Sequence, residues 1–461
     1  MAVRLRSGSW TAKAWSSGLA LLLLIGGISL GVRVGDVVSQ GGGQIVDYRG
    51  AFVPDASPVL RQLSPAVSVG GGSSAIALDS LAGTAYVANS ASRTVSVISH
   101  STTYWLSATL RTPQVPVGLL VDEQDQVLLV TGYNESGVVN GTVTAYSMTN
   151  GSLLASVQVG VLPFSMAFSP NADELFVANY NGGGVSILSV SPLRLLMSLN
   201  VSSYGVLYDP FDGMVFCATG DLNGSVLEID PMTNEIIHTI RVGGIPVLLF
   251  VNPWNQYLYV PCLNSSDGLQ NATYVINTAA GVPVGVAPLP AQPSMLGFDT
   301  SNGDVIVGSN RFTNQQQFFD GNLTVISGAT SMVVATIPIS PYFYGLGSDN
   351  ATGALYLLTR GNLTVFNATA VSPLYEVAVN GSAFLLSVDP GRGALFIVAP
   401  SYSVDDSGQV DVYRAPLGVP LEVPETVAPT GGPSLGLWPL GLSIAAGAVV
   451  ALVYGIRRRR H

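Results

Sequence analysis

The sequence has few of the residues that chemically active sites commonly use. Its 461 residues include three histidines, two cysteines and a single lysine, Lys13. This composition leaves almost no ligands for haem, zinc or an iron–sulfur cluster. One lysine near the N-terminus also excludes Schiff-base and P-loop chemistry from everything after it. We therefore expect no cofactor and no metal centre built from histidine or cysteine.

Charged residues are scarce as well, at 10% of the chain, whereas 48% of the residues are hydrophobic. Acids outnumber bases 28 to 18, which gives a net charge of −10 and argues against a basic face for nucleic acid. Glycine and proline are abundant, with 52 and 28 residues. Such a composition favours a β protein that turns often over a helical one.

The charges are divided between an acidic body and two basic ends. All 28 acids lie between Asp36 and Glu425, where ten arginines occur, so this stretch has a net charge of −18. The N-terminal bases precede an apolar run, Leu19–Val32, that has the length of a signal-peptide core. Cleavage would make it a signal peptide; without cleavage it would be a signal anchor.

A second apolar run near the C-terminus predicts a membrane span. Leu435–Ile456 contains 22 residues without charge, and four arginines, Arg457–Arg460, follow at once. This length suits a bilayer, and the positive-inside rule places the arginines in the cytoplasm. The predicted regions are a signal peptide or anchor (1–40), an exterior domain (41–415), a Pro/Gly-rich stalk (416–434), a transmembrane helix (435–456) and a cytoplasmic tail (457–461).

Sites for N-glycosylation support an exterior location. Sequons with a non-proline middle residue are about three times as frequent as chance predicts, although Asn-Gly-Ser/Thr also suits tight turns. They begin at Asn134, Asn140, Asn150, Asn200, Asn223, Asn264, Asn271, Asn322, Asn350, Asn362, Asn367 and Asn380.

An apolar five-residue segment recurs eight times at an average spacing of about 44 residues. It begins at residues 85, 128, 175, 215, 258, 305, 355 and 395. Each copy is preceded by a short apolar strand and a turn, and followed by a Gly/Asn loop and two more strands. Four short strands per repeat predict an all-β fold, a β-propeller of four-stranded blades, because stacked blades bury the faces of each sheet.

Two repeats carry a family resemblance. The segments LPFSMAFSPNADELFVANYNGGGVSIL (162–188) and GTAYVANSASRTVSVIS (83–99) resemble the YVTN-type β-propeller repeat of archaeal and bacterial surface proteins. The resemblance extends over about residues 67–414. The other repeats keep the pattern of hydrophobic positions but not the characteristic residues of the motif. It implies a propeller on a cell surface, of the surface-layer-like kind, and implies no activity.

The repeat count predicts eight blades, with seven as the alternative. The last repeat has three strands, and Val59–Val69 resembles an orphan fourth strand. Pairing that segment with the last blade would close the ring and remove its open edges.

The histidines, cysteines and recurring acids are the residue types that catalysis or metal binding would use, but we interpret them as structural residues. No two of His100, His238 and His461 share a repeat position, and no oriented partner is evident for any of them. Cys217 and Cys262 are predicted to be buried free thiols. Acids recur where the first strand of most repeats ends, and we interpret them as turn residues that accept backbone hydrogen bonds. Calcium binding is left open.

The long loops between second and third strands are the most informative departure from the repeat. They lie at Tyr133–Gly141, Leu263–Asn271, Ser309–Asn322 and Pro400–Gln409. We expect them to share one face with the links between repeats. Exposed aromatic side chains with an arginine suit recognition of a sugar or a protein. Alternatively, Phe318 and Phe319 could fold inwards and cap the central channel of the propeller. The candidate binding residues are Arg311, Phe312, Phe318, Phe319, Tyr342, Phe343, Tyr344 and Tyr402.

The sequence therefore predicts a membrane-anchored extracellular propeller that acts as a recognition, adhesion or envelope-associated module. Its partners would be the membrane, through the C-terminal helix, and glycans or envelope proteins, without nucleic acid. One alternative is an exported propeller enzyme, a hydrolase or lyase acting on glycans or lactones. Another is a purely structural surface-layer component.

Overall fold

The structure of the chain is a computed structural model. It describes residues 60–415 except 221–223, 264–270, 313–317, 341, 350–351, 370 and 402–406. Both apolar runs, the stalk, Tyr402 and three of the sequon asparagines (Asn223, Asn264 and Asn350) lie outside the described residues. Within those residues, no helix has the length and apolarity needed to span a bilayer.

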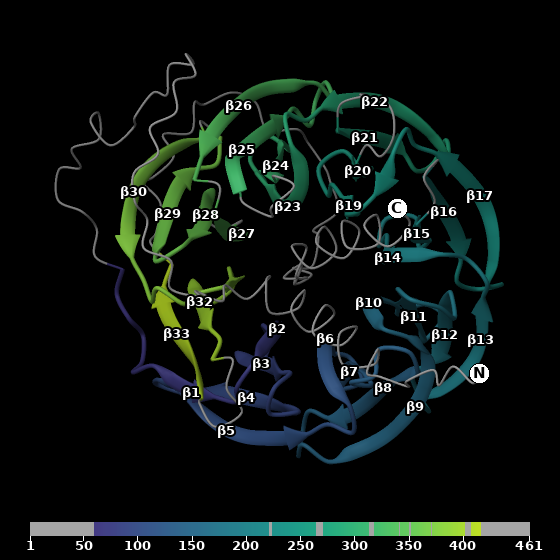
Figure 1. Cartoon of the computed structure of the whole chain (residues 1–461), viewed down its shortest axis with the longest axis vertical. Coiled ribbons are helices and arrows are strands. Elements are labelled where there is room, and N and C mark those ends of the chain that lie inside the picture. Colours follow the sequence, from purple (N-terminus) through teal and green to yellow (C-terminus); the bar gives the residue numbers. More distant parts are fainter. Residues whose placement is uncertain are drawn as a thin grey trace, which may run out of the picture.

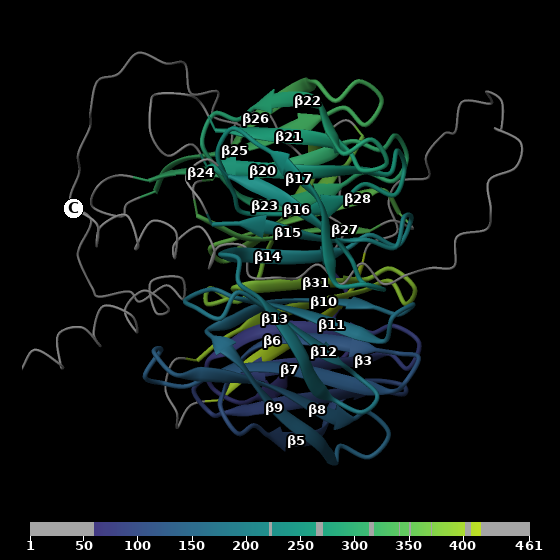
Figure 2. The same cartoon turned by 90° about the vertical axis from the view of Figure 1, so that its right-hand side faces the viewer.

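Eight antiparallel β-sheets are arranged around a centre, and the innermost strands lie closest to it (Figure 1). In the perpendicular view, the blades stack from β22 at the top to β5 at the bottom, so the molecule is a disc seen from its side (Figure 2). The all-β propeller predicted from the repeats is confirmed, with eight blades rather than seven.

Blades one to four each use four consecutive strands, from the centre outwards. Blade one contains β2 (Ser73–Asp79), β3 (Thr84–Asn89), β4 (Thr94–His100) and β5 (Tyr104–Arg111). Blade two contains β6 (Val115–Asp122), β7 (Val127–Tyr133), β8 (Asn140–Ser147) and β9 (Leu153–Val161). Blade three contains β10 (Pro163–Ser169), β11 (Glu174–Asn179), β12 (Val185–Ser189) and β13 (Arg194–Leu199). Blade four contains β14 (Ser203–Tyr208), β15 (Val215–Thr219), β16 (Ser225–Asp230) and β17 (Glu235–Arg241).

Blades five to eight follow the same plan with two variations: the inner strand of blade five is split, and blade eight borrows a strand. Blade five contains β18 (Ile245–Pro246), β19 (Phe250–Val251), β20 (Tyr257–Leu263), β21 (Ala272–Asn277) and β22 (Val282–Pro288). Blade six contains β23 (Gln292–Phe298), β24 (Val305–Phe312), β25 (Phe318–Ile326) and β26 (Val333–Ile339). Blade seven contains β27 (Phe343–Asp349), β28 (Ala354–Thr359), β29 (Asn362–Asn367) and β30 (Ser372–Ala378). Blade eight contains β31 (Leu385–Asp389), β32 (Ala394–Ala399), β33 (Gly408–Arg414) and β1 (Val67–Val69).

The ring is closed by the N-terminal strand, as the sequence predicted. β1 pairs antiparallel with β33, so that Val67 lies opposite Val410 and Val69 opposite Gly408. An isolated bridge between Gln62 and Tyr413 extends this contact. The strand that completes blade eight therefore precedes the first strand of blade one in the sequence. Every strand of the closed ring lies between Val67 and Arg414, so residues 41–424 contain the complete propeller.

Eight hydrophobic clusters lie between neighbouring blades, one for each pair, and a ninth smaller cluster is formed by Tyr204, Ile245, Val247 and Leu263 of blades four and five. The second strand of each blade is covered on both faces, which explains why the recurring five-residue segment is continuously apolar rather than alternating. All five residues of β15, for example, are buried. Stacking each sheet between two others is thus the main source of buried apolar area.

The two cysteines occupy this core as predicted. Both are free and buried. Cys217 packs with residues of blade three, and Cys262 packs with Phe216 and Ala218 of blade four. Each thiol thus faces the preceding blade. Burial raises the pKa of both, to about 12 for Cys217, so they are poor nucleophiles.

One predicted loop is largely strand. The segment Ser309–Asn322 was expected to be a loop, but β24 continues to Phe312 and β25 begins at Phe318, with these two residues paired. This longer hairpin extends beyond the disc, on the left in Figure 2.

Candidate functional site

The two faces of the disc are built from different connections. The innermost strand of each blade begins at one face and ends at the other. The turn face carries the turns between first and second strands and between third and fourth strands. The recognition face carries the loops between second and third strands and the links between blades. Antiparallel pairing within each blade requires this division.

A ring of buried polar residues lies where the inner strands end on the turn face. Their exposed fractions are all 4% or less. In Asp79, Asp122, Asp209, Asn252, Asp299 and Asp389, the side-chain oxygen accepts a hydrogen bond from a backbone amide two or three residues further on, such as Ala82 to Asp79 (2.9 Å) and Phe211 to Asp209 (2.8 Å). The predicted structural role is therefore confirmed. The ring consists of Asp79, Asp122, Ser169, Asp209, Asn252, Asp299, Asp349 and Asp389.

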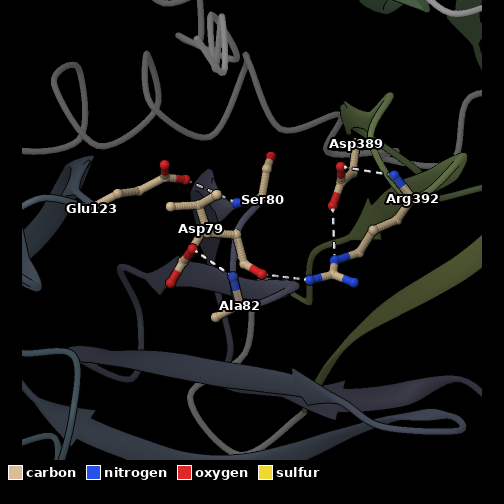
Figure 3. Close-up of polar contacts among 7 residues, drawn as sticks. Asp79, Ser80, Ala82, Glu123, Asp389 and Arg392 are labelled. Carbon is tan, nitrogen blue, oxygen red and sulfur yellow. Dashed lines mark hydrogen bonds and ion pairs between the residues drawn. The ribbon is translucent and has the colours of Figure 1, made fainter. Parts of the chain in front are cut away.

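Polar contacts on the same face join blade one to its two neighbours, blades two and eight (Figure 3). Glu123 of blade two accepts a hydrogen bond from the Ser80 amide at 3.1 Å. Arg392 of blade eight donates to the Leu81 carbonyl at 2.7 Å, and its Nε lies 3.7 Å from Asp389 Oδ2. The first turn of blade one is thus held from both sides, next to the seam at which the ring closes.

A substitution at Gly83 tests how much these contacts contribute to stability. Its φ is +70°, and a Cβ there would overlap the Arg392 guanidinium. We expect Gly83→Ala to lower the free energy of unfolding by about 2–3 kcal/mol, because both a left-handed alanine and a displaced arginine are costly. Gly393→Ala is the matched control, since φ is +57° and nothing lies within 4 Å of its Cβ. Denaturant unfolding should show a loss of only about 1 kcal/mol there. Equal losses would exclude a role for Arg392.

On the recognition face, blades six to eight carry aromatic and cationic side chains. Arg311 at the end of β24 is exposed, with Nη1 3.6 Å from Asp320 Oδ2. Tyr342, just before β27, is 40% exposed. The Arg360 amide donates to the Tyr342 carbonyl at 3.2 Å, which joins the turn after β28 to this segment. Within the described ranges, the Arg360 guanidinium has no carboxylate partner.

Tyr344 adds a half-buried aromatic ring to this group. It stacks at a tilt on Phe384 of blade eight, with ring centroids 5.4 Å apart. Burial raises the pKa of Tyr344, and the nearby charge of Arg360 opposes that rise. We call Tyr342, Tyr344, Arg360 and Phe384, together with Arg311 at the end of β24 on the same face, the recognition cluster.

The other predicted binding residues differ in their placement. Phe343 is 4% exposed and packs in the core between blades six and seven, so it is not available to a ligand. This is the alternating geometry of a strand, which places neighbours on opposite faces. The backbones of Phe312, Phe318 and Phe319 belong to β24 and β25, and their side chains lie outside what the structure describes.

Sequence reasoning missed Arg360 and Phe384. Arg360 lies in a short turn whose sequence contains no recognisable motif. Its position between the second and third strands of the blade nevertheless places it on the recognition face. Phe384 corresponds to Tyr344 in the repeat, as do Phe164 and Tyr204 in blades three and four. Aligning the starts of the inner strands would have found this aromatic position. Tyr204 stacks on Tyr180, with ring centroids 5.2 Å apart.

One histidine has a partner that the sequence did not reveal. The register of β16 and β17 places His238 opposite Glu228, and His238 Nδ1 lies 2.9 Å from Glu228 Oε2. Glu228 is 4% exposed, and burial raises its pKa while His238 lowers it. The two residues form an oriented pair with no third catalytic group evident. In the part of the chain that the structure describes, no group of three His, Cys, Asp or Glu residues could hold a metal ion.

Comparisons with known proteins show that other proteins share the fold of this chain, but they do not assign the chain to a family. No protein-family pattern matches the chain, and no curated protein matches it by sequence. Similar solved structures include the C-terminal WD40 domain of Sif2, with 12% identity, a TM-score of 0.60 and coverage of 77% of this chain and 98% of that one. BamB from Moraxella catarrhalis has 17% identity, a TM-score of 0.53 and coverage of 77% and 100%. Dihydro-heme d1 dehydrogenase NirN, in complex with DHE, has 13% identity, a TM-score of 0.59 and coverage of 88% and 91%. Because these identities are low and the proteins differ in function, the chain is similar to them as a β-propeller.

Proposed function

We propose that this protein is a membrane-anchored propeller outside the cell that binds glycans through its recognition face. The observation that carries the proposal is the recognition cluster. Exposed or half-buried aromatic rings stack on the apolar faces of sugars, and guanidinium groups donate directional hydrogen bonds to hydroxyls and carboxylates. The cluster combines both on one face of a chain that is otherwise acidic.

The placement of the sequons supports an exterior location. Each of the nine described sequon asparagines is partly or fully exposed, so a glycosyl group could be attached without unfolding a blade. By contrast, the buried Asn89, Asn179, Asn252 and Asn310 belong to no sequon. The predicted N-terminal signal peptide or anchor and the predicted C-terminal membrane span agree with this placement.

A catalytic role has one supporting observation, the Glu228–His238 pair. This pair lies on the outer strands of blade four, away from the recognition cluster, and the neighbouring carboxylates provide no evident nucleophile. We therefore place recognition ahead of catalysis.

A glycan array probed with residues 41–424 tests the proposal. We expect binding to a subset of glycans that falls at least about tenfold in the double variant Tyr342→Ala/Arg360→Gln, because both groups contact the ligand. The control is Trp254→Ala/Arg194→Gln, which removes an exposed aromatic and an arginine from the turn face and should bind like the parent protein. Absence of binding to any glycan, or equal loss in both variants, would contradict the proposed function.

A further inference from the structure

The first residues of the inner strands follow a pattern that the proposed function does not use. In six blades, the pairing of the inner strand with the second strand shifts register near its start, and one residue bulges out of the ladder. A bulge re-aims its side chain and commonly lies next to a functional site. The bulged residues, all at the recognition-face end of their strands, are Ser74, Val117, Phe164, Tyr204, Ser294 and Tyr344.

Val247 and Phe384 occupy the same position in the two remaining blades. The Val247 amide donates to the Pro261 carbonyl at 3.0 Å, and the Phe384 amide donates to the Val398 carbonyl at 2.8 Å. Pro261 and Val398 are both the fourth residue of the recurring five-residue segment. The position is therefore aromatic in blades three, four, seven and eight, and small or aliphatic in the others.

The aromatic positions form two pairs on opposite sides of the ring. Blade three lies four blades from blade seven, and blade four lies four blades from blade eight, so that each pair is half a turn from the other (Figure 1). Tyr344 and Phe384 belong to the recognition cluster. We call their counterparts, Phe164 and Tyr204, together with Tyr180 directly after β11, the opposite cluster.

The opposite cluster repeats the stacked arrangement of the recognition cluster. The ring centroids of Tyr180 and Tyr204 are 5.2 Å apart with a tilt of 32°, and those of Tyr344 and Phe384 are 5.4 Å apart with a tilt of 42°. Phe164 and Tyr180 are partly exposed and pack on the small core cluster of blades four and five. None of the described residues in this group is charged, so it is an uncharged counterpart of the recognition cluster.

The hydroxyl of Tyr180 is not explained by packing. It is buried and has no hydrogen-bond partner among the described residues. A buried hydroxyl without a partner is unfavourable, and a phenylalanine would stack on Tyr204 in the same way without it. An oxygen atom of a bound sugar would supply the missing acceptor.

We propose that the opposite cluster is a second subsite, which holds an uncharged sugar of the same glycan that contacts the recognition cluster. This inference rests on the proposed function and names its ligand class: an extended oligosaccharide that crosses the centre of the recognition face. Aromatic rings stack on the apolar faces of neutral sugars without needing a charge. Small or aliphatic residues at the intervening positions leave these two aromatic pairs as the stacking platforms of the series. Two contacts on one chain raise its affinity above that of either contact alone.

An array of size-graded oligosaccharides, neutral and acidic and of about two to about ten sugar units, tests this subsite with residues 41–424. We expect the longer members of a binding series to bind at least about tenfold more tightly than the shortest, because the second contact adds to the first. Phe164→Leu/Tyr180→Leu keeps the apolar volume and removes both rings, so it should abolish this gain and leave binding of the shortest members unchanged. The matched control, Trp105→Leu/Trp254→Leu, removes exposed rings from the rim and the turn face and should keep the gain.

The outcomes separate this subsite from the proposed function. Equal affinity for short and long members, a gain that persists in Phe164→Leu/Tyr180→Leu, or calorimetry that finds two long chains per protein would overturn the subsite while the recognition cluster still binds. Weaker binding of short and long members alike in Tyr342→Ala/Arg360→Gln supports the recognition cluster as the first contact. Absence of binding to any member would overturn both proposals. Circular dichroism and thermal unfolding establish that each variant is folded.

Discussion

Replacing Val69 by aspartate is expected to open the ring and unfold the propeller. Val69 is 3% exposed in β1, and with Val67 it packs in the cluster between blades eight and one. A buried carboxylate without a partner costs several kcal/mol, and the strand has only three residues with which to hold the seam. We expect a loss of at least about 4 kcal/mol, measured by denaturant unfolding.

Ser68→Asp is the matched control for this experiment. Ser68 lies between the two valines in the same strand, and its side chain is exposed. The same charge at this position should change stability by less than about 0.5 kcal/mol. If Val69→Asp were as stable as Ser68→Asp, β1 would not be the strand that closes the ring.

The second large effect concerns pH. The pKa of every described carboxyl group that departs clearly from its ordinary value is raised, with burial as the largest cause. These groups are Asp122, Glu123, Glu174, Asp209, Asp212, Glu228, Asp304 and Asp389. A raised pKa means that the folded state binds the proton more tightly than the unfolded state. Stability should therefore fall as pH rises from about 4 to about 7.

Asp209 has a strongly raised pKa. Burial, then the charges of Asp212 and Glu228, raise its pKa from 3.8 to about 7, although the Phe211 amide lowers it. Its Oδ2 is buried and has no hydrogen-bond partner among the described residues. Above pH 7 the ionised group costs at most about 4 kcal/mol, and below pH 4 the cost is absent.

Asp209→Asn should consequently raise the free energy of unfolding at pH 8 by about 2–4 kcal/mol and leave it nearly unchanged at pH 4. Blade five already has asparagine at this position: Asn252 Oδ1 accepts from the Trp254 amide at 2.9 Å, and Nδ2 donates to the Gly303 carbonyl at 2.8 Å. Asp125→Asn removes an exposed charge from the same face and serves as the control. Denaturant unfolding at both pH values would contradict the account if Asp209→Asn were destabilising at pH 8, or if both variants gained equally.

The fold could be predicted from the sequence because it is repeated. Eight copies of a doubly covered strand, such as Val215–Thr219, leave a signal that no single blade would give. The closing role of Val67–Val69 followed from counting strands in the last repeat. Both inferences depend on local patterns that recur, and the structure confirms them.

The candidate site could be predicted only in outline. The face of the disc that carries the site follows from the order of the strands. Phe343 and Tyr344 differ in burial because successive side chains of a strand point to opposite faces. The sequence alone does not say which of the two faces the core. Arg360 approaches Tyr342 through the pairing of β27 with β28 within blade seven, whereas Phe384 belongs to blade eight, so its contact with Tyr344 depends on how neighbouring blades pack. The Glu228–His238 pair likewise depends on register, which a bulge between Glu228 and Ile229 alters.

Hydrogen exchange with and without a glycan identified on the array tests the central proposal most directly. The proposal predicts protection on the recognition face of blades six to eight, at residues 309–322, 342–345, 358–362 and 382–385. It predicts no change at the turn-face segments 79–83 and 389–393. Protection confined to the turn face, or protection at the recognition cluster that persists in Tyr342→Ala/Arg360→Gln at equal affinity, would contradict it.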